Sequence, residues 1–217
     1  MTKPTALFLF DESGNMAQPW IEAGFPCICV DTQHEPGAQT DGLLTRVGAD
    51  VLEYLPPRTT YAFAAAFPPC TDLAISGAQY FQDKGLAALA GSLHLVNRAR
   101  EILEWTGAPW MIENPVGTLS TYWRTPDYSF DPCDFGGYLT PPGDAYTKKT
   151  HLWTGGGFAF PWPKPVAPIR TNSQGGWMQS LGGKSERTKR LRSATPKGFA
   201  RAVFTTNQPQ PAALQSA

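Results

Sequence analysis

The sequence predicts an α/β protein in which helices cover both faces of a mostly parallel sheet. Short apolar runs alternate with helical stretches along the first half of the chain, and this order is typical of strand–helix–strand proteins. At 217 residues, the chain is long enough to bury one core, so we expect residues 1–207 to form a single domain. Residues 208–217, rich in proline and alanine, are expected to form a disordered tail.

The first three strands are expected at 5–10, 26–31 and 60–67. The run TALFLF is apolar and stops at an acidic turn, as buried parallel strands do. A helix through Ala17 and Trp20 is expected after it. The second strand, PCICVD, ends in an acid, and the third, TYAFAAAF, runs directly into two prolines and a cysteine.

The clearest helix is expected between Gly85 and Gly107. Its apolar residues lie mostly along one broad stripe, and Gly107 is a suitable stop. The stripe consists of Leu86, Leu89, Leu93, Val96, Ile102 and Leu103.

The second half of the chain is expected to add two strands and a last helix. The strands are PWMIENP (109–115) and THLWTGG (150–156). Residues 155–184, rich in glycine, proline and tryptophan, are expected to be irregular. Thr195 is predicted to cap the last helix, with Pro196 at its first position.

The composition argues against a membrane protein and against a secreted protein held together by disulfides. No apolar run approaches the roughly 18 residues that a membrane span needs, and the N-terminus is too short and too soon acidic for a signal peptide. With four cysteines in this length, free thiols and a cytoplasmic location are expected rather than a disulfide scaffold. The cysteines show no CxxC or Cys-His spacing, so no metal site is expected.

The formal charge is zero, from 18 basic and 18 acidic residues. This balance argues against an extensive nucleic-acid-binding surface, because such a surface needs many Lys and Arg side chains to neutralise phosphates. One stretch, GGKSERTKRLRS, concentrates basic residues and includes Lys189, Arg190 and Arg192. It is either a solvated face or a patch that contacts phosphates.

The side chains suited to binding or catalysis fall at the ends of the predicted strands, where parallel sheets bind ligands. Gly14 allows a close approach of backbone to ligand. Asp31, ending the second strand, suits ribose hydroxyls, although an acid there can also be a turn residue. Together they predict an adenosine-type ligand. Asp50 and the segment around Cys70 are expected at the same edge.

Cys70 and Glu113 form the second part of this predicted site. Pro68 and Pro69 fix the backbone before Cys70, which suits a nucleophile held on a rigid loop; the alternative is a structural thiol. Glu113 follows an apolar run, so burial should raise its pKa; the alternative is an acid bonded to its own turn. As a pair, a thiolate and a carboxyl group suit addition to a pyrimidine ring followed by its alkylation.

These motifs resemble those of the cytosine C5-methyltransferases that use S-adenosylmethionine. FPPC resembles the nucleophile loop, and IENP resembles the Glu-Asn motif. The remaining matches, in order, are LFDESGNM, VDTQ, GAD at 48–50, TKKTHLWTGG and ATPKGFARAVF. The ordered set extends over residues 5–204, and it implies a Rossmann-like methyltransferase fold.

The resemblance implies roles for particular residues. The catalytic residues would be Cys70, which attacks C6 of cytosine, Glu113, which holds N3 and the exocyclic amine, and Lys148. S-adenosylmethionine would contact Phe10, Gly14, Asp31, Asp50, Pro69 and Thr195. The substrate, DNA or a cytosine nucleotide, would contact Asn114, Lys189, Arg190 and Arg192.

The chain also departs from the family pattern. The first motif has one glycine, Pro115 replaces a valine, and Lys148 replaces an arginine. The segment available for reading DNA sequence, about 155–193, is short, so this is a compact form with little or no recognition domain. We therefore expect methyl transfer to cytosine in DNA. The alternatives are the same chemistry on a free nucleotide or with a modified one-carbon group, and a silent nucleic-acid-binding relative.

Overall fold

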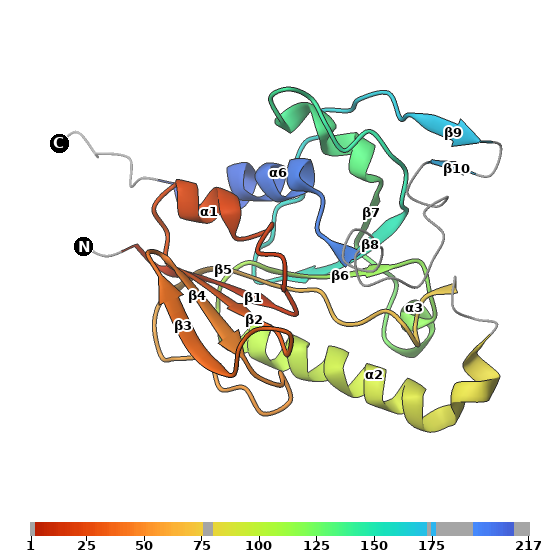
Figure 1. Cartoon of the computed structure of the whole chain (residues 1–217), viewed down its shortest axis with the longest axis horizontal. Helices are drawn as coiled ribbons and strands as arrows, with labels where there is room; N and C mark the ends of the chain where they lie inside the picture. The colour runs from red at the N-terminus through yellow and green to blue at the C-terminus, as the bar shows by residue number, and fades with distance from the viewer. Residues whose placement is uncertain (1–2, 76–79, 173–174, 177–192, 211–217) are drawn as a thin grey trace.

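The computed structural model describes residues 3–75, 80–172, 175–176 and 193–210. These residues form an eight-stranded sheet (Figure 1). From one edge to the other, the strands are β3 (Gly37–Asp41), β4 (Leu44–Gly48), β2 (Cys27–Val30), β1 (Thr5–Leu9), β5 (Tyr61–Ala66), β6 (Trp110–Pro115), β8 (Thr150–Gly155) and β7 (Tyr128–Phe130).

The sheet is mostly parallel. The neighbouring strands β4, β2, β1, β5 and β6 all pair in parallel. β8 is antiparallel to both of its neighbours, β6 and β7, and β3 is antiparallel to β4. The predicted α/β class is therefore confirmed.

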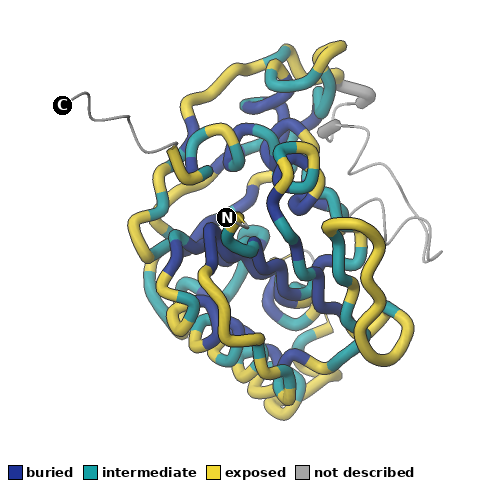
Figure 2. The backbone as a smooth tube through the Cα atoms, turned by 90° about the vertical axis from the view of Figure 1, so that its left-hand side faces the viewer, coloured by how far each residue is buried: buried dark blue, intermediate teal, exposed yellow. Residues whose placement is uncertain are grey.

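Helices cover both faces of this sheet (Figure 1). One face carries α1 (Gln18–Glu22), α6 (Lys197–Asn207) and the 3-10 segment η2 (Pro132–Tyr138). The other carries α2 (Phe81–Trp105) and α3 (Leu119–Tyr122). The central strands β1 and β5 are almost wholly buried. Buried residues gather toward the middle of the molecule, and exposed residues lie mostly around it (Figure 2).

Strand β1 shows how one apolar run fills two cores. Ala6 and Phe8 join the cluster under α1 and α6, whereas Leu7 and Leu9 join the cluster under α2. Side chains alternate along a strand, so a strand buried on both faces must be apolar at every position. This is why the uninterrupted run in the sequence predicts the strand correctly.

Helix α2 agrees only in part with its prediction. It stops before Gly107, whose φ of 67° supports the predicted helix end. Leu86 was expected in the buried stripe but is 85% exposed, which corrects that prediction. A non-helical Gly85 precedes it, and the buried residues of the helix lie further along, at Val96, Ile102 and Leu103. The first turns of α2 thus extend beyond the sheet.

The start of α6 also differs from the prediction. Pro196, rather than Thr195, occupies the N-cap position, and no side chain at that position caps the helix. The cap comes from Asp144, whose Oδ2 accepts a hydrogen bond from Gly198 N at 2.7 Å. A cap provided from 54 residues away leaves no local signal in the sequence.

The segment expected to be irregular contains a small antiparallel sheet of two strands, β9 (Arg170–Asn172) and β10 (Gly175–Gly176). In the part of the chain that the structure describes, no helix has both the length and the apolarity needed to cross a bilayer.

Of the predicted tail 208–217, residues 211–217 lie outside the described residues.

Candidate functional site

Most of the predicted site residues that the structure describes lie where the parallel strands end. The five parallel strands, β1, β2, β4, β5 and β6, point in the same direction. Their carboxyl ends therefore lie together along one edge of the sheet, which runs across the strands. β8 runs the other way, so it begins at that edge, with Thr150 opposite Pro115. This register brings Lys148, two residues before Thr150, to the end of β6.

The turn after β1 is held by a carboxylate that was not among the predicted site residues. Oδ1 of Asp11 accepts hydrogen bonds from Ser13 Oγ at 2.9 Å and from Gly14 N at 2.8 Å. Gly14 has φ 68°, and Phe10, before the turn, has φ 57°. Positive φ is uncommon in a residue other than glycine, and such backbone strain often marks functional sites.

Asp11 also has an unused acceptor. It is 3% exposed, and its Oδ2 is buried without a hydrogen-bond partner. Burial raises the pKa of this carboxyl, as does the negative charge of Asp31, and the bonds from Ser13 and Gly14 oppose the rise. The rule that singled out Asp31, an acid directly after a strand, also fits Asp11.

Asp31 and Asp50 lie at the ends of the next two strands. Asp31 is buried, and its Oδ1 accepts a hydrogen bond from Gln33 N at 2.9 Å. Asp50 is exposed, and its Oδ1 accepts a hydrogen bond from Leu52 N at 2.9 Å. Both carboxylates therefore help to form their own turns, as the alternative interpretation of Asp31 proposed, while lying at the predicted edge.

The Cys70 loop is tied to β6 by the residue after Glu113. Asn114 is fully buried, and its Nδ2 donates to Pro68 O at 3.0 Å. After Cys70 the chain turns back, because Cys70 O accepts hydrogen bonds from the backbone amides of Leu73 and Ala74. The motifs FPPC and IENP are thus joined directly by a hydrogen bond.

A second contact holds the same loop. Thr118 N donates to Leu73 O at 2.8 Å, and Ala74 pairs with Gly117 in an antiparallel bridge. A methyl group on Gly117 would overlap the Leu73 carbonyl, so glycine is required for this close approach. The loop that carries Cys70 is therefore positioned from both strands β5 and β6.

The other three cysteines are unsuited to act as nucleophiles. Cys27, Cys29 and Cys133 are buried, whereas Cys70 is partly exposed, and none of the four forms a disulfide. Burial raises the pKa of Cys27 to about 12 and also raises the pKa values of Cys29 and Cys133. Since the thiolate is the reactive form, accessibility favours Cys70.

Glu113 lies in a narrow recess on the opposite face of the sheet from Asn114. The recess is lined by Glu113, Phe130, Lys148, Phe199 and the segment 193–196. Burial raises the pKa of the Glu113 carboxyl, and the Lys148 charge and a hydrogen bond from Thr150 partly oppose this rise. The raised pKa confirms the expectation from the sequence.

The recess is closed on one side by the segment Ser193–Pro196, which we call the strap. Its Thr195 O accepts a hydrogen bond from Asn15 Nδ2 at 3.0 Å. Asn15 follows Gly14, so this bond joins the turn after β1 to the recess around Glu113. Because Asn15 and Thr195 are 180 positions apart, the sequence carries no signal for the contact.

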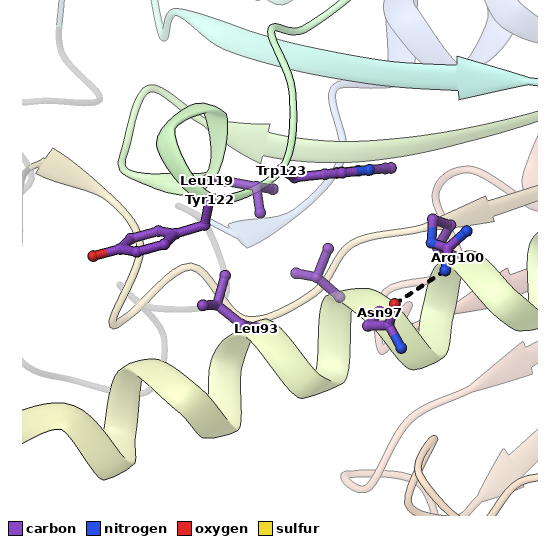
Figure 3. A pocket seen from close by; sticks show the side chains of 7 residues that line it. Leu93, Asn97, Arg100, Leu119, Tyr122 and Trp123 are labelled. Atoms are coloured by element: carbon purple, nitrogen blue, oxygen red, sulfur yellow. Dashed lines mark hydrogen bonds between the residues drawn. The ribbon is translucent and has the colours of Figure 1, made fainter.

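A larger groove lies on the other face, between α2 and α3 (Figure 3). Its volume is about 210 Å³, and Leu93, Leu119, Tyr122 and Trp123 are among its lining residues. None of the predicted site residues within the described ranges lines this groove. Arg100, a cation that lines it, is bonded to Asn97 and Glu104. The groove is larger, but the recess contains the ionisable side chains Glu113 and Lys148. We therefore take the recess as the candidate functional site.

The structure brings Glu113, Lys148 and Thr195 together in one recess and places Pro69, which is exposed, before Cys70. Lys189, Arg190 and Arg192 lie outside the described residues. Tyr146 was not predicted, yet burial and the charges of Asp144 and Glu113 raise its pKa. Its side chain therefore lies within electrostatic reach of the recess.

No family model and no curated protein matches the chain. Among solved structures, it is similar to the CcbJ methyltransferase from Streptomyces caelestis, with 16% identity, a TM-score of 0.30, and coverage of 59% of this chain and 49% of that one. It is also similar to the glycopeptide N-methyltransferase MtfA, with 11% identity, a TM-score of 0.29, and coverage of 60% and 53%. A second MtfA structure, complexed with S-adenosyl-L-methionine, shows 10% identity and the same TM-score and coverage. The chain spans about half the length of these proteins.

Proposed function

We propose that this protein transfers a methyl group from S-adenosylmethionine to C5 of cytosine in DNA, through a covalent adduct with Cys70. The observation that carries the proposal is the hydrogen bond from Asn114 to Pro68 O. It fixes a loop bearing an accessible thiol beside the strand that bears Glu113. Covalent catalysis on a ring requires a positioned nucleophile and a group that can hold a proton.

The turn after β1 fits a cofactor of this kind. Asp11 presents a buried carboxylate oxygen without a partner, which suits a cationic or hydrogen-donating ligand. Gly14 leaves the backbone uncovered, because no heavy atom lies within 4 Å of the position that a side-chain methyl group would occupy. Asp31 follows on the next strand and suits the ribose hydroxyls. When bound, the cofactor supplies an electrophilic methyl group.

Cys70 would act first, as a thiolate that forms a bond to C6 of the pyrimidine. The electron pair of the C5–C6 double bond then moves into the ring, toward C5 and N3. Glu113, with its raised pKa, would hold a proton at N3 and accept a hydrogen bond from the exocyclic amine, which stabilises this charge. C5 would then take the methyl group, which leaves S-adenosylhomocysteine as the second product. Loss of the C5 proton to solvent would restore the C5–C6 double bond and break the C6–S bond, so that Cys70 leaves as a thiolate and the proton at N3 returns to Glu113.

A free cytosine nucleotide is the second candidate substrate. The formal charge of the chain is zero, and the predicted recognition segment, 155–193, is short. Flipping a base out of duplex DNA also costs a few kcal/mol, which must be recovered from contacts with the polymer. A mononucleotide would need neither the recognition segment nor the phosphate contacts.

The test combines transfer and trapping. Labelled S-adenosylmethionine would be incubated with duplex DNA, single-stranded DNA, RNA and dCMP, and oligonucleotides containing 5-fluorocytosine would be used to trap the adduct. We expect label in cytosine and a covalent adduct with the wild type, with no adduct for Cys70→Ala. Cys133→Ala, which alters a buried thiol on η2, should still form it. Equal trapping by Cys70→Ala would exclude this nucleophile, and binding without transfer to any substrate would support the silent relative.

A further inference from the structure

The recess around Glu113 is too small, as it stands, to hold a pyrimidine. Its free volume is about 10 Å³, which is the room of about one water molecule. Small-molecule sites usually offer about 300–1,000 Å³. A base that is to reach Glu113 must therefore displace one wall of the recess.

The walls differ in how firmly they are held. Glu113 belongs to β6 and pairs with Leu152 of β8 inside the sheet. Phe130 and Phe199 stack in the core with ring centres 4.0 Å apart. The strap, Ser193–Pro196, is neither strand nor core. Because the strap lies outside the sheet and outside both apolar clusters, the strap and the long Lys148 side chain, which also lines the recess, are the walls that can move at the lowest cost.

The contacts that hold the strap include the first backbone hydrogen bond of α6, in which Pro196 O accepts from Ala200 N at 3.0 Å. Beyond its C-terminal end, Gly198 N bonds to Asp144, and a methyl group at Gly198 would overlap the Phe135 carbonyl, so α6 itself is fixed on η2. Within the strap, Thr195 O accepts the bond from Asn15 Nδ2. Asn15 belongs to the turn after β1, next to Gly14.

We propose that the Asn15–Thr195 hydrogen bond is a latch that holds the strap closed over Glu113. Asn15 is thus a positioning residue for the base, and release of the latch admits a cytosine ring. The second part of the inference rests on the proposed function: because the cofactor would occupy the turn that carries Asn15, cofactor binding and base entry are coupled through this bond. A ligand that shifts the turn then changes the affinity for the base, and the reverse holds equally.

The latch can be tested without any activity. In a Cys70→Ser background, Glu113→Cys places a thiol on the floor of the recess, and its alkylation by iodoacetamide reports opening. We expect Asn15→Ala to raise the alkylation rate at position 113 about threefold to tenfold, the equivalent of one net hydrogen bond. Gln18→Ala, which removes an exposed bond to Glu22 in α1, is the matched control and should leave the rate unchanged. An unchanged rate in Asn15→Ala would overturn the latch.

The coupling is tested by calorimetry on the chain with its native Cys70 and Glu113. We expect S-adenosylhomocysteine to change the dCMP affinity of the wild type severalfold. In Asn15→Ala the two affinities should become independent, and dCMP without cofactor should bind about threefold to tenfold more tightly, because the closed state no longer competes. Unchanged coupling in Asn15→Ala would overturn this second part. If dCMP fails to bind while the alkylation rate rises, the substrate proposal fails and the latch stands.

Discussion

Glu113 and Asn114 are neighbours in β6, and their side chains leave opposite faces of the sheet. Glu113 lines the recess with Phe199 of α6, whereas Asn114 reaches across to Pro68 O before the Cys70 thiol. This follows from the alternation of side chains along a strand. In the proposed reaction, one dipeptide would therefore contact the substrate with its first residue and fix the Cys70 loop with its second.

The raised pKa of Glu113 predicts how stability depends on pH. Burial is its main cause, so the folded state binds this proton more tightly than the unfolded state. Stability contributed by the group is present at low pH and is lost as pH rises from the unfolded pKa through the raised folded pKa. Glu113→Gln removes this loss. We expect the variant to be more stable than the wild type at pH 8 and to lose that advantage below about pH 4, as measured by urea unfolding.

The matched control for this prediction is Glu104→Gln. Glu104 lies on the surface of α2 with its side chain 47% exposed, where it pairs with Arg100. Its unfolding profile should not gain stability at pH 8. Glu113→Gln should also lower kcat about 10²-fold, the scale of losing one group that stabilises developing charge. A variant less stable than the wild type at pH 8 would show that the Glu113 charge is well paired in the fold.

At the scale of the elements, the position of the Cys70 loop depends on the close approach of two segments that follow β5 and β6. Gly117 lies against the Leu73 carbonyl. Gly117→Ala should push the two segments apart and lower the free energy of unfolding by about 1–3 kcal/mol, as overpacking does. It should also slow trapping by 5-fluorocytosine, because Cys70 is carried on the displaced loop.

Gly91→Ala is the control, because it adds the same methyl group at a position where there is space for it. Gly91 lies within α2, and a methyl group there would meet no atom within 4 Å. Alanine favours a helix over glycine by about 1 kcal/mol, so this variant should be more stable, with unchanged trapping. Equal effects of the two substitutions in urea unfolding would contradict the role assigned to the Gly117 contact.

The elements that the sequence predicted share a physical cause. β1, β2, β5 and the first half of β6 are buried on both faces, so their sequences are mostly apolar runs. β3 was missed because all five of its residues, GAQTD, are exposed at the edge of the sheet, and it has no apolar alternation. The buried stripe of α2 was overextended to Leu86 because periodicity alone does not show where the sheet ends.

The placement of the candidate site residues was predictable to the extent that topology determines it. Ligands bind at the carboxyl ends of parallel strands, and this rule placed Gly14, Asp31, Cys70 and Glu113 at one edge. What the sequence could not show are contacts between distant segments. The bond from Asn15 to the strap is such a contact, and so are the antiparallel register of β8 and the cap that Asp144 gives to α6.

At the scale of the whole molecule, the balance of charge bears on how DNA would be bound. Basic side chains in the described segments are often paired with acids, as in Arg124–Asp127, Lys149–Asp131 and Arg201–Glu22. Paired cations contribute less to binding phosphates, since their charge is already compensated. The dense basic stretch between Lys184 and Arg192, which lies outside the described residues, therefore remains the predicted source of phosphate contacts.

That prediction is tested by the salt dependence of DNA binding. Replacing Lys189, Arg190 and Arg192 with alanine should weaken binding to duplex DNA and flatten the plot of log affinity against log salt, by roughly 0.9 for each lost phosphate contact. Arg100→Ala, which removes a guanidinium paired with Glu104 on α2, should leave the slope unchanged.

Activity on dCMP should change far less in the triple variant, because a mononucleotide does not need the extended phosphate contacts. An unaltered slope would make the stretch a solvated face. Transfer to dCMP but to no polymer would make the free nucleotide the substrate, since phosphate contacts along a strand would then have no part in the reaction.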